Sequence, residues 1–167
     1  MITEMKIARL PQGRSLTEPM TAIVTVGGVG LLPFAPGSWG SLAALPVGWL
    51  IGVTGGWPAL LIAAIIVSAI GWIASDRYIK ATGRDDPPEI VIDEVAAQWL
   101  AMTVVPMTIW GLIGAYFVFR LFDTIKPWPA SWADGELEGG AGVMLDDLIA
   151  GAYSILPLLA LNIMGWF

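Results

Sequence analysis

The sequence contains neither cysteine nor histidine among its 167 residues. Their absence excludes disulfides, thiolate nucleophiles, zinc sites of the usual kind and any imidazole acid or base. Any chemistry must therefore use carboxylates, lysine, arginine, hydroxyl groups and backbone amides.

Charge is missing from three long stretches of the chain. No residue is charged between Glu18 and Asp76, between Glu94 and Arg120, or from Leu148 to Phe167. The hydrophobic fraction is 56% and the mean hydropathy is +0.74, which is high for a soluble domain of this size. We therefore expect lipid around most of the chain.

The polar N-terminus differs from the remainder of the sequence. Residues 1–19 are charged and lack the basic and apolar regions of a cleavable signal peptide. We expect these residues to form a cytoplasmic N-terminal tail, followed by a single membrane-embedded domain over residues 20–167.

The first uncharged gap is long enough for two membrane helices, because one span needs about 20 residues. It predicts a helical hairpin with helices near residues 41–53 and 59–74 and a turn at TGGWP. The stretch before it is apolar but is broken by glycine and proline, which predicts a re-entrant or interfacial segment. The breaking residues are Gly27, Gly28, Pro33 and Pro36.

The second gap fits either one comfortable span or a short hairpin with Pro106 near its middle. All eight basic residues fall on one side of the membrane if this gap is a hairpin, and the positive-inside rule favours that arrangement. The hairpin predicts helices near residues 90–105 and 107–125, although a single span stays open.

A last helix is expected near residues 144–164. The fold class is then all-α, a polytopic membrane helical bundle with four to five membrane helices, an internal N-terminus and an external C-terminus. Trp57, Trp110 and Trp166 would mark the outer interface as an aromatic belt.

Four polar motifs converge on the inner face in this topology. They carry five acids that repel one another in lipid unless a cation neutralises them, and two basic residues cannot balance five carboxylates. A site of oxygen ligands alone is typical of Mg²⁺, and Mg²⁺ at headgroup depth indicates phosphate chemistry. The acids are Asp93, Glu94, Asp123, Asp146 and Asp147.

Other polar residues are expected either to bind phosphate or to be exposed to solvent. Arg120 and Lys126 would neutralise phosphoryl oxygens. The helix-leading loop PGSWGS can hold an anion through Gly37, Ser38, Gly40 and Ser41, although loop flexibility and helix capping are the alternatives. The glycines of EGGAG are interpreted as a similar loop. Six further acids are expected to lie in solvated loops, namely Asp85, Asp86, Glu89, Asp134, Glu136 and Glu138.

These motifs resemble those of the phosphatidylglycerophosphatase A family, which are small bacterial inner-membrane lipid phosphatases. The matching segments follow in order from about residue 31 to residue 151. They are PGSWGS at 36–41, DE at 93–94, RLFDTIKPWP at 120–129 and GGAGVMLDDLIAG at 139–151.

The resemblance implies removal of the terminal phosphate of phosphatidylglycerol phosphate to give phosphatidylglycerol, in phospholipid biosynthesis. It also implies a requirement for Mg²⁺ and an active site that faces the cytoplasm. The lipid substrate and the bilayer are the expected partners, no nucleic acid is expected, and the oligomeric state stays open.

Two chemical routes remain without histidine or cysteine: attack by a water that Mg²⁺ activates, or attack by an aspartate. Water is preferred because the DxDx(T/V) signature of aspartyl-phosphate phosphatases is absent. Asp93, Glu94, Asp123 and one or both of Asp146 and Asp147 would hold Mg²⁺, and a remaining carboxylate would take the proton of the water. The pattern does not distinguish ligand from base.

Three other functions are consistent with part of the pattern. An ion channel or transporter could have an acidic cytoplasmic vestibule, but the uncharged outer halves of the helices leave it no continuous polar route. A phosphatase for a different phospholipid phosphomonoester would use the same residues. A structural membrane protein would leave the surplus of carboxylates unexplained.

Overall fold

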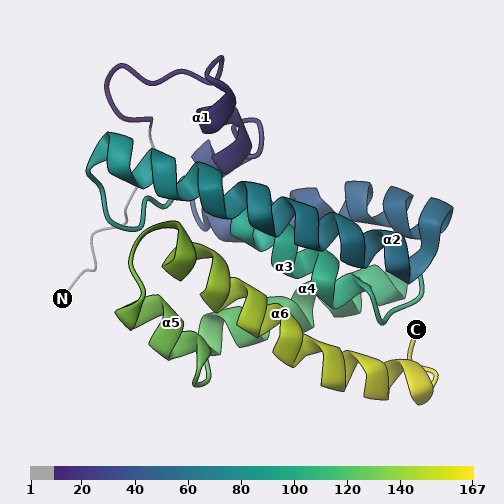
Figure 1. The fold of residues 1–167 in the computed structure, drawn as a ribbon. Coiled ribbons are helices and arrows are strands. Elements are labelled where there is room, and N and C mark those ends of the chain that lie inside the picture. The colour runs from purple at the N-terminus through teal and green to yellow at the C-terminus, as the bar shows by residue number, and fades with distance from the viewer. Residues whose placement is uncertain (1–9) are drawn as a thin grey trace.

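The structure is a computed structural model and describes residues 10–167. Within these residues it contains helices and no strand, so the predicted all-α class is confirmed (Figure 1). The first nine residues of the predicted tail lie outside the described part. In chain order the elements are α1 (Pro19–Val24), η1 (Val29–Leu31), α2 (Pro36–Thr82), α3 (Ile92–Met102), α4 (Ile109–Ile125), α5 (Ala130–Glu136) and α6 (Gly139–Ile163).

The long element α2 is a helical hairpin, as predicted. Gly56 interrupts it with φ of 68° and ψ of −172°, a conformation that glycine adopts at little cost. Ser41 near its start bonds to Glu94, and Tyr78 near its end bonds to Glu89, so both ends of α2 lie beside the start of α3. Figure 1 shows the chain reversing direction between them.

The second gap also forms a hairpin and not a single span. Glu94 near the start of α3 accepts hydrogen bonds from Arg120 near the end of α4, so the chain returns to the end from which it came. The reversal lies between Met102 and Ile109, around Pro106. The hairpin interpretation of this stretch is confirmed.

The central helix α3 is shorter and more buried than predicted. It has 11 residues, about 16 Å at 1.5 Å per residue, and every residue except Leu100 is buried. It packs against α2, α4 and α6. Small residues allow the close approach: Gly48 lies against the ring of Trp99, and Gly151 lies against the carbonyl of Ala97.

Two helices among the described residues, α2 and α6, are long and apolar enough to cross a membrane. In α2 only 11% of the most apolar 18-residue window is buried inside the protein, whereas the core helix of a soluble protein buries most of its apolar side chains. The value for α6 is 39%. Because α3 and α4 are shorter than a full span, four to five membrane helices stay a prediction.

Several helix boundaries differ from the predicted ones. The hairpin α2 extends at both ends, from Pro36 to Thr82, and α6 begins at Gly139, five residues before the predicted start. The EGGAG segment is therefore mostly the first turn of α6, and PGSWGS at 36–41 forms the first turns of α2, so the interpretation of both segments as loops was wrong.

The irregular N-terminal segment forms only the short elements α1 and η1, so the expectation that no regular span occurs there is confirmed. It lies against the loop before α3, where the N–H of Val91 donates to the carbonyl of Val24 at 2.9 Å. Its placement relative to a membrane stays a prediction.

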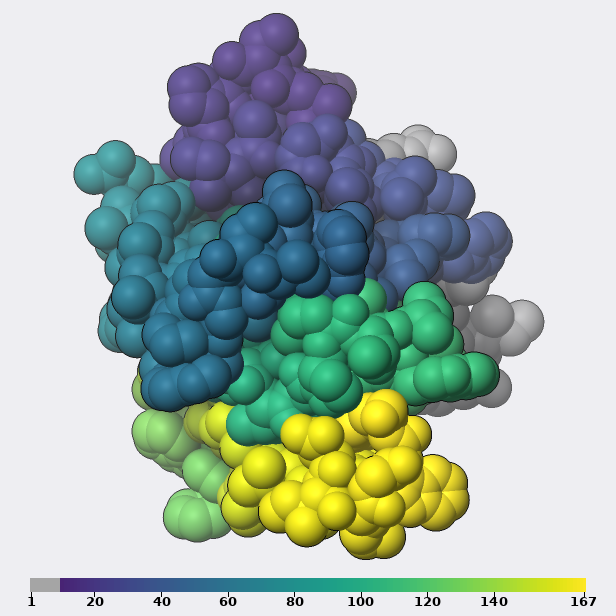
Figure 2. Space-filling model, turned by 90° about the vertical axis from the view of Figure 1, so that its right-hand side faces the viewer, coloured from purple at the N-terminus to yellow at the C-terminus, as the bar shows by residue number. Residues whose placement is uncertain are grey.

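The two ends of the bundle carry different residues. One end contains ion pairs within α2, within the loop before α3, between α3 and α4, and between the end of α4 and α6. Figure 2 looks onto the other end, where the turn of α2, the start of α4 and the C-terminal residues lie together. The sequence there is uncharged, so candidate functional groups are confined to the first end.

Candidate active site

A cavity of about 500 Å³ opens at the charged end of the bundle. Its walls come from the first turn of α2, the loop before α3, and the site-facing ends of α3, α4, α5 and α6. The five predicted carboxylates and Lys126 all line it, so motifs far apart in the sequence meet in one place. The carboxylates are Asp93, Glu94, Asp123, Asp146 and Asp147.

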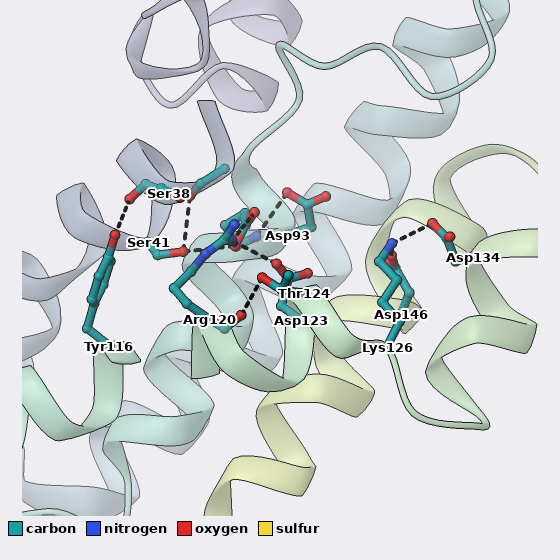
Figure 3. A network of polar contacts seen from close by, with 12 residues as sticks. Ser38, Ser41, Asp93, Tyr116, Arg120, Asp123, Thr124, Lys126, Asp134 and Asp146 are labelled. Atoms are coloured by element: carbon teal, nitrogen blue, oxygen red, sulfur yellow. Dashed lines mark hydrogen bonds and ion pairs between the residues drawn. The ribbon is translucent and has the colours of Figure 1, made fainter. Parts of the chain in front are cut away.

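Glu94 is the centre of a polar network, of which Ser41, Arg120 and Asp123 are labelled in Figure 3. Its Oε2 accepts a hydrogen bond from Ser41 Oγ at 2.8 Å, and both its oxygens accept from Arg120 Nη1 at 2.6 and 2.7 Å. The same guanidinium nitrogen lies 2.9 Å from Asp123 Oδ2. Arg120 is therefore held by two carboxylates, and it is not among the described residues that line the cavity.

Lys126 forms a second charged group beside the first. It ends α4 in a left-handed conformation before Pro127, and its Nζ binds Asp134 and, at 2.7 Å, Asp146. Partial burial acts to lower the pKa of Lys126, but the two carboxylates outweigh it and raise the pKa above its ordinary value. Its ammonium group therefore stays charged at the cavity wall.

Three carboxylates are arranged as a hard cation requires. Glu94, Asp123 and Asp147 each present an oxygen, and these oxygens lie within 4.8 Å of one another. Magnesium–oxygen bonds of about 2.0–2.1 Å place ligands around one ion at comparable separations. Among the described residues, Asp147 Oδ2 and Asp146 Oδ1 are buried without a hydrogen-bond partner. Unsatisfied buried oxygens and an oxygen-only donor set fit Mg²⁺.

The adjacent acids Asp146 and Asp147 serve different parts of the site. Both lie about two turns inside α6, beyond the first turn where the helix dipole favours an acid. Neighbouring residues point about 100° apart on a helix. Asp146 accordingly binds Lys126, and Asp147 joins the Glu94–Asp123 group.

The motif glycines allow elements to approach the site closely. A Cβ on Gly37 would meet the Glu94 carboxylate, and one on Gly40 would lie 2.8 Å from Val91 Cβ. Gly140 fits against the backbone of Trp72 and Asp76 in the second arm of α2. Glycine is required at these positions because a side chain would not fit, so loop flexibility is not the reason for the glycines.

The predicted phosphate-binding residues at the start of α2 have different positions. Gly37 lines the cavity, whereas Ser38, Gly40 and Ser41 do not belong to its described lining. Ser41 donates its hydroxyl to Glu94 and to the Gly37 carbonyl. Their role in phosphate binding, like that of Arg120, stays a prediction.

Two acids assigned to a solvated loop have structural partners. Glu89 is fully buried, accepts a hydrogen bond from Tyr78 at 2.9 Å and pairs with Arg84, so its assignment to solvent was wrong. Asp134 is exposed but binds Lys126 at the cavity wall. Tyr78 lies on α2 and Lys126 at the end of α4, whereas Arg84 lies in the same loop as Glu89. The remaining acids Asp85, Asp86, Glu136 and Glu138 are exposed as expected.

Known proteins are similar to this chain over the residues that form the cavity. The family model described as phosphatidylglycerophosphatase A matches residues 22–162. A phosphatidylglycerophosphatase A of Escherichia coli (strain K12) is 34% identical over 140 residues, which are 83% of this chain and 81% of that protein. The Haemophilus influenzae protein of the same name is 31% identical over 149 residues, 89% of this chain and 91% of that protein.

A third relative has a different name. A Bacteroides thetaiotaomicron protein, provisionally named phosphatidylinositol-3-phosphatase, is 32% identical over 135 residues, 77% of this chain and 84% of that protein. No solved structure matches the chain. The family match extends from α1 through α6 and includes all the carboxylates of the cavity. The chain therefore belongs to the phosphatidylglycerophosphatase A family of phosphatases.

Proposed function

We propose that the chain hydrolyses the terminal phosphate of phosphatidylglycerol phosphate to phosphatidylglycerol, with Mg²⁺, in bacterial phospholipid biosynthesis. The proposal rests on Glu94, Asp123 and Asp147. These three residues line the charged cavity, and their oxygens lie close enough together to bind one cation. Family membership supports the reaction and the lipid.

Glu94, Asp123 and Asp147 would hold the metal, with Asp146 adjoining them. When bound, Mg²⁺ would offset the carboxylate charge and polarise the phosphoryl oxygens as a Lewis acid. Arg120 bonds to Glu94 and Asp123 at once, so we assign it to positioning these two ligands.

Among the described residues, Lys126 is the cationic residue that lines the cavity and can contact the substrate. Its ammonium group lies at the cavity wall between Asp134 and Asp146, which hold it in place. A phosphoryl oxygen in the cavity would gain a charge-assisted hydrogen bond from it, and this bond strengthens as negative charge develops in the transition state.

Asp93 is the carboxylate best suited to accept a proton. It lines the cavity, and its Oδ1 accepts the N–H of Glu94 at 2.9 Å, which fixes its orientation. No cation of the described residues pairs with it. Asp93 would take a proton from the attacking water as the phosphorus–oxygen bond to the lipid breaks, and that proton would then pass through solvent in the cavity to the leaving oxygen, which gives inorganic phosphate and the lipid alcohol.

The membrane placement is part of the proposal. The hairpin arms of α2, together with α4 and α6, would cross the bilayer as a multi-pass bundle with the cavity at cytoplasmic headgroup depth. Trp57, Trp110 and Trp166 are 62%, 65% and 69% exposed at the uncharged end, which suits an aromatic belt at the outer interface. The uncharged half offers no polar route for an ion channel.

The test is phosphate release by the purified protein from a panel of lipids. Phosphatidylglycerol phosphate should be hydrolysed fastest, activity should vanish in EDTA, and added Mg²⁺ should restore it. Phosphatidylinositol 3-phosphate belongs in the panel because one relative is named for that lipid. Faster hydrolysis of this lipid would replace the proposed substrate, and full activity in EDTA would exclude the metal mechanism. Ion flux in proteoliposomes without phosphate release would favour a channel.

A further inference from the structure

A second hollow, of about 590 Å³, lies between the first arm of α2 and α4. Its described lining is apolar throughout, in contrast to the catalytic cavity. In Figure 2 the blue first arm of α2 and the green α4 lie next to each other. The lining includes Leu42, Leu45 and Trp49 of α2 and Ile109, Leu112 and Ile113 of α4. We name it the α2–α4 groove.

Both walls of the α2–α4 groove continue toward the catalytic cavity. On α2, residues 42, 45 and 49 share one helical face, and Ser38 lies one turn before Leu42 on that face. On α4, residues 109 and 113 share a face that continues through Tyr116 to Arg120. The same two helix faces therefore form the groove and reach the site.

Hydrogen bonds join the two walls at each end of the groove. Toward the site, the Tyr116 hydroxyl donates to the Ser38 carbonyl at 3.4 Å. Toward the uncharged end, Trp49 Nε1 donates to the Met107 carbonyl at 3.1 Å. Figure 3 shows Tyr116 and Ser38 on one side of Arg120, with the Lys126 group on the other. Groove, Tyr116 link and charged cavity thus follow one another along α4.

We infer that the α2–α4 groove receives an acyl chain of the lipid phosphomonoester whose phosphate lies in the cavity. The inference rests on the proposed function. Such a lipid has a charged head and an apolar chain, and the protein presents a charged cavity and an apolar groove along the same pair of helices. Gly37 at the cavity and Leu45 in the groove are eight residues apart, about 12 Å along the helix.

The groove aligns the lipid more than it increases affinity. An acyl chain that leaves the bilayer for an apolar groove exchanges one apolar environment for another, so little hydrophobic free energy is gained. A chain held along α4 would instead fix the direction from which the phosphate enters the cavity. Loss of the groove should therefore lower kcat/KM for long-chain lipid.

Filling the groove tests this alignment. Ile113→Trp should lower kcat/KM for dioleoyl phosphatidylglycerol phosphate about fivefold to tenfold, as expected when positioning is lost, and should spare a dibutyryl analogue. Leu42→Trp should act in the same way and is the second variant if the first folds poorly. Ile66→Trp is the matched control, because Ile66 is 52% exposed on the other arm of α2 and outside the groove lining.

Unchanged activity of both groove variants on the long-chain lipid would overturn the inference. An equal loss on the long-chain and short-chain substrates would also overturn it, because the groove would then act on the site and not on the chain.

Photolabelling separates this inference from the proposed reaction. Phosphatidylglycerol phosphate with a diazirine in its acyl chain is irradiated with the protein immediately after mixing, and labelled peptides are identified by mass spectrometry. Residues 42–49 and 109–113 should be labelled in excess over labelling by phosphatidylcholine with the same chain. Equal labelling by both probes would overturn the inference, whereas failure of phosphate release alone would overturn only the proposed reaction.

Discussion

The two ends of the bundle are held together by different interactions. At the charged end, five buried carboxylates of the cavity are accompanied by two basic residues, Arg120 and Lys126, so negative charge exceeds positive charge within the site. At the uncharged end, glycines lie against large side chains, as Gly48 does against Trp99 and Gly114 against Phe167. Unbalanced charge costs stability, whereas close packing provides it.

The difference indicates that the charged end is maintained for function and the uncharged end for stability. Substitutions that neutralise an acid at the charged end should lower turnover and leave thermal stability unchanged or higher, because charge repulsion is relieved. Substitutions at the uncharged end should lower stability with little effect on turnover. The predictions below test this contrast, in decreasing order of effect on turnover.

Asp147→Asn should have the largest effect. It removes charge from the Glu94–Asp123–Asp147 group, so kcat should fall about 100-fold to 1,000-fold, the range seen when one transition-state-stabilising group is lost. The thermal midpoint should stay equal or rise. Phosphate release and thermal unfolding of the same preparation measure both quantities. Near-normal turnover would contradict the assignment.

A metal-binding readout and a control accompany this variant. Mg²⁺ should raise the thermal midpoint of the wild-type protein, since a hundredfold excess over Kd stabilises a folded state by about 2.7 kcal/mol. Asp147→Asn should lose most of that increase. Glu136→Gln neutralises an exposed acid outside the cavity lining and should change neither quantity.

Lys126→Ala should have the next largest effect. It removes the cation assigned to a phosphoryl oxygen, and kcat should fall about 10-fold to 100-fold, less than for a group used for the transition state alone. Lys126→Arg keeps the charge but changes its geometry, and should restore part of the activity. If Lys126→Ala and Lys126→Arg were equally impaired, the charge of Lys126 would not be the cause.

Asp134→Asn should have a smaller effect than Lys126→Ala. Asp134 holds Lys126 but its side chain is 48% exposed. An ion pair with an exposed partner is worth about 0.2–1 kcal/mol, so kcat/KM should fall by no more than about fivefold. A loss as large as that of Lys126→Ala would mean that Asp134 contacts the substrate or the metal directly.

The order and direction of the helices were predictable because the charged residues of this sequence are few and lie between long uncharged stretches. The uncharged gaps indicated two hairpins, and the positive-inside rule brought the motifs with Glu94, Arg120 and Asp147 to the same end. Both hairpins and the shared cavity occur in the structure.

Helix lengths and individual partners were less predictable for physical reasons. The helix α2 continues to Thr82 because helical hydrogen bonding does not stop where charge resumes. After Glu94, Gln98 is the one polar residue of α3, so the periodicity of this segment does not distinguish a buried helix from a lipid-facing one. Glu89 pairs with Arg84 in its own loop, but its burial against Tyr78 of α2 arises only when the loop packs on that helix, and a charged loop sequence does not indicate burial.

Gly48→Ala should have the smallest effect on turnover and a clear effect on stability. An added Cβ would lie 2.7 Å from Trp99 Cδ1 and 2.9 Å from Met102 Cε. The methionine can move, but the Trp99 ring is fixed by its hydrogen bond to the Ala44 carbonyl at 2.9 Å. Overpacking of this kind costs about 1–3 kcal/mol.

Thermal unfolding and low-temperature turnover measured on Gly48→Ala decide whether packing at the uncharged end is separate from catalysis. The thermal midpoint should fall while kcat stays within about twofold of the wild-type value, because overpacking strains the site of contact and not the distant carboxylates. Val47→Ala is the matched control, because Val47 is next to Gly48 on the same arm of α2, is 50% exposed and lies outside the cavity lining, and alanine is a good helix former. If Gly48→Ala lost turnover in proportion to stability, the two ends would be coupled through α3, and the contrast between them would not hold.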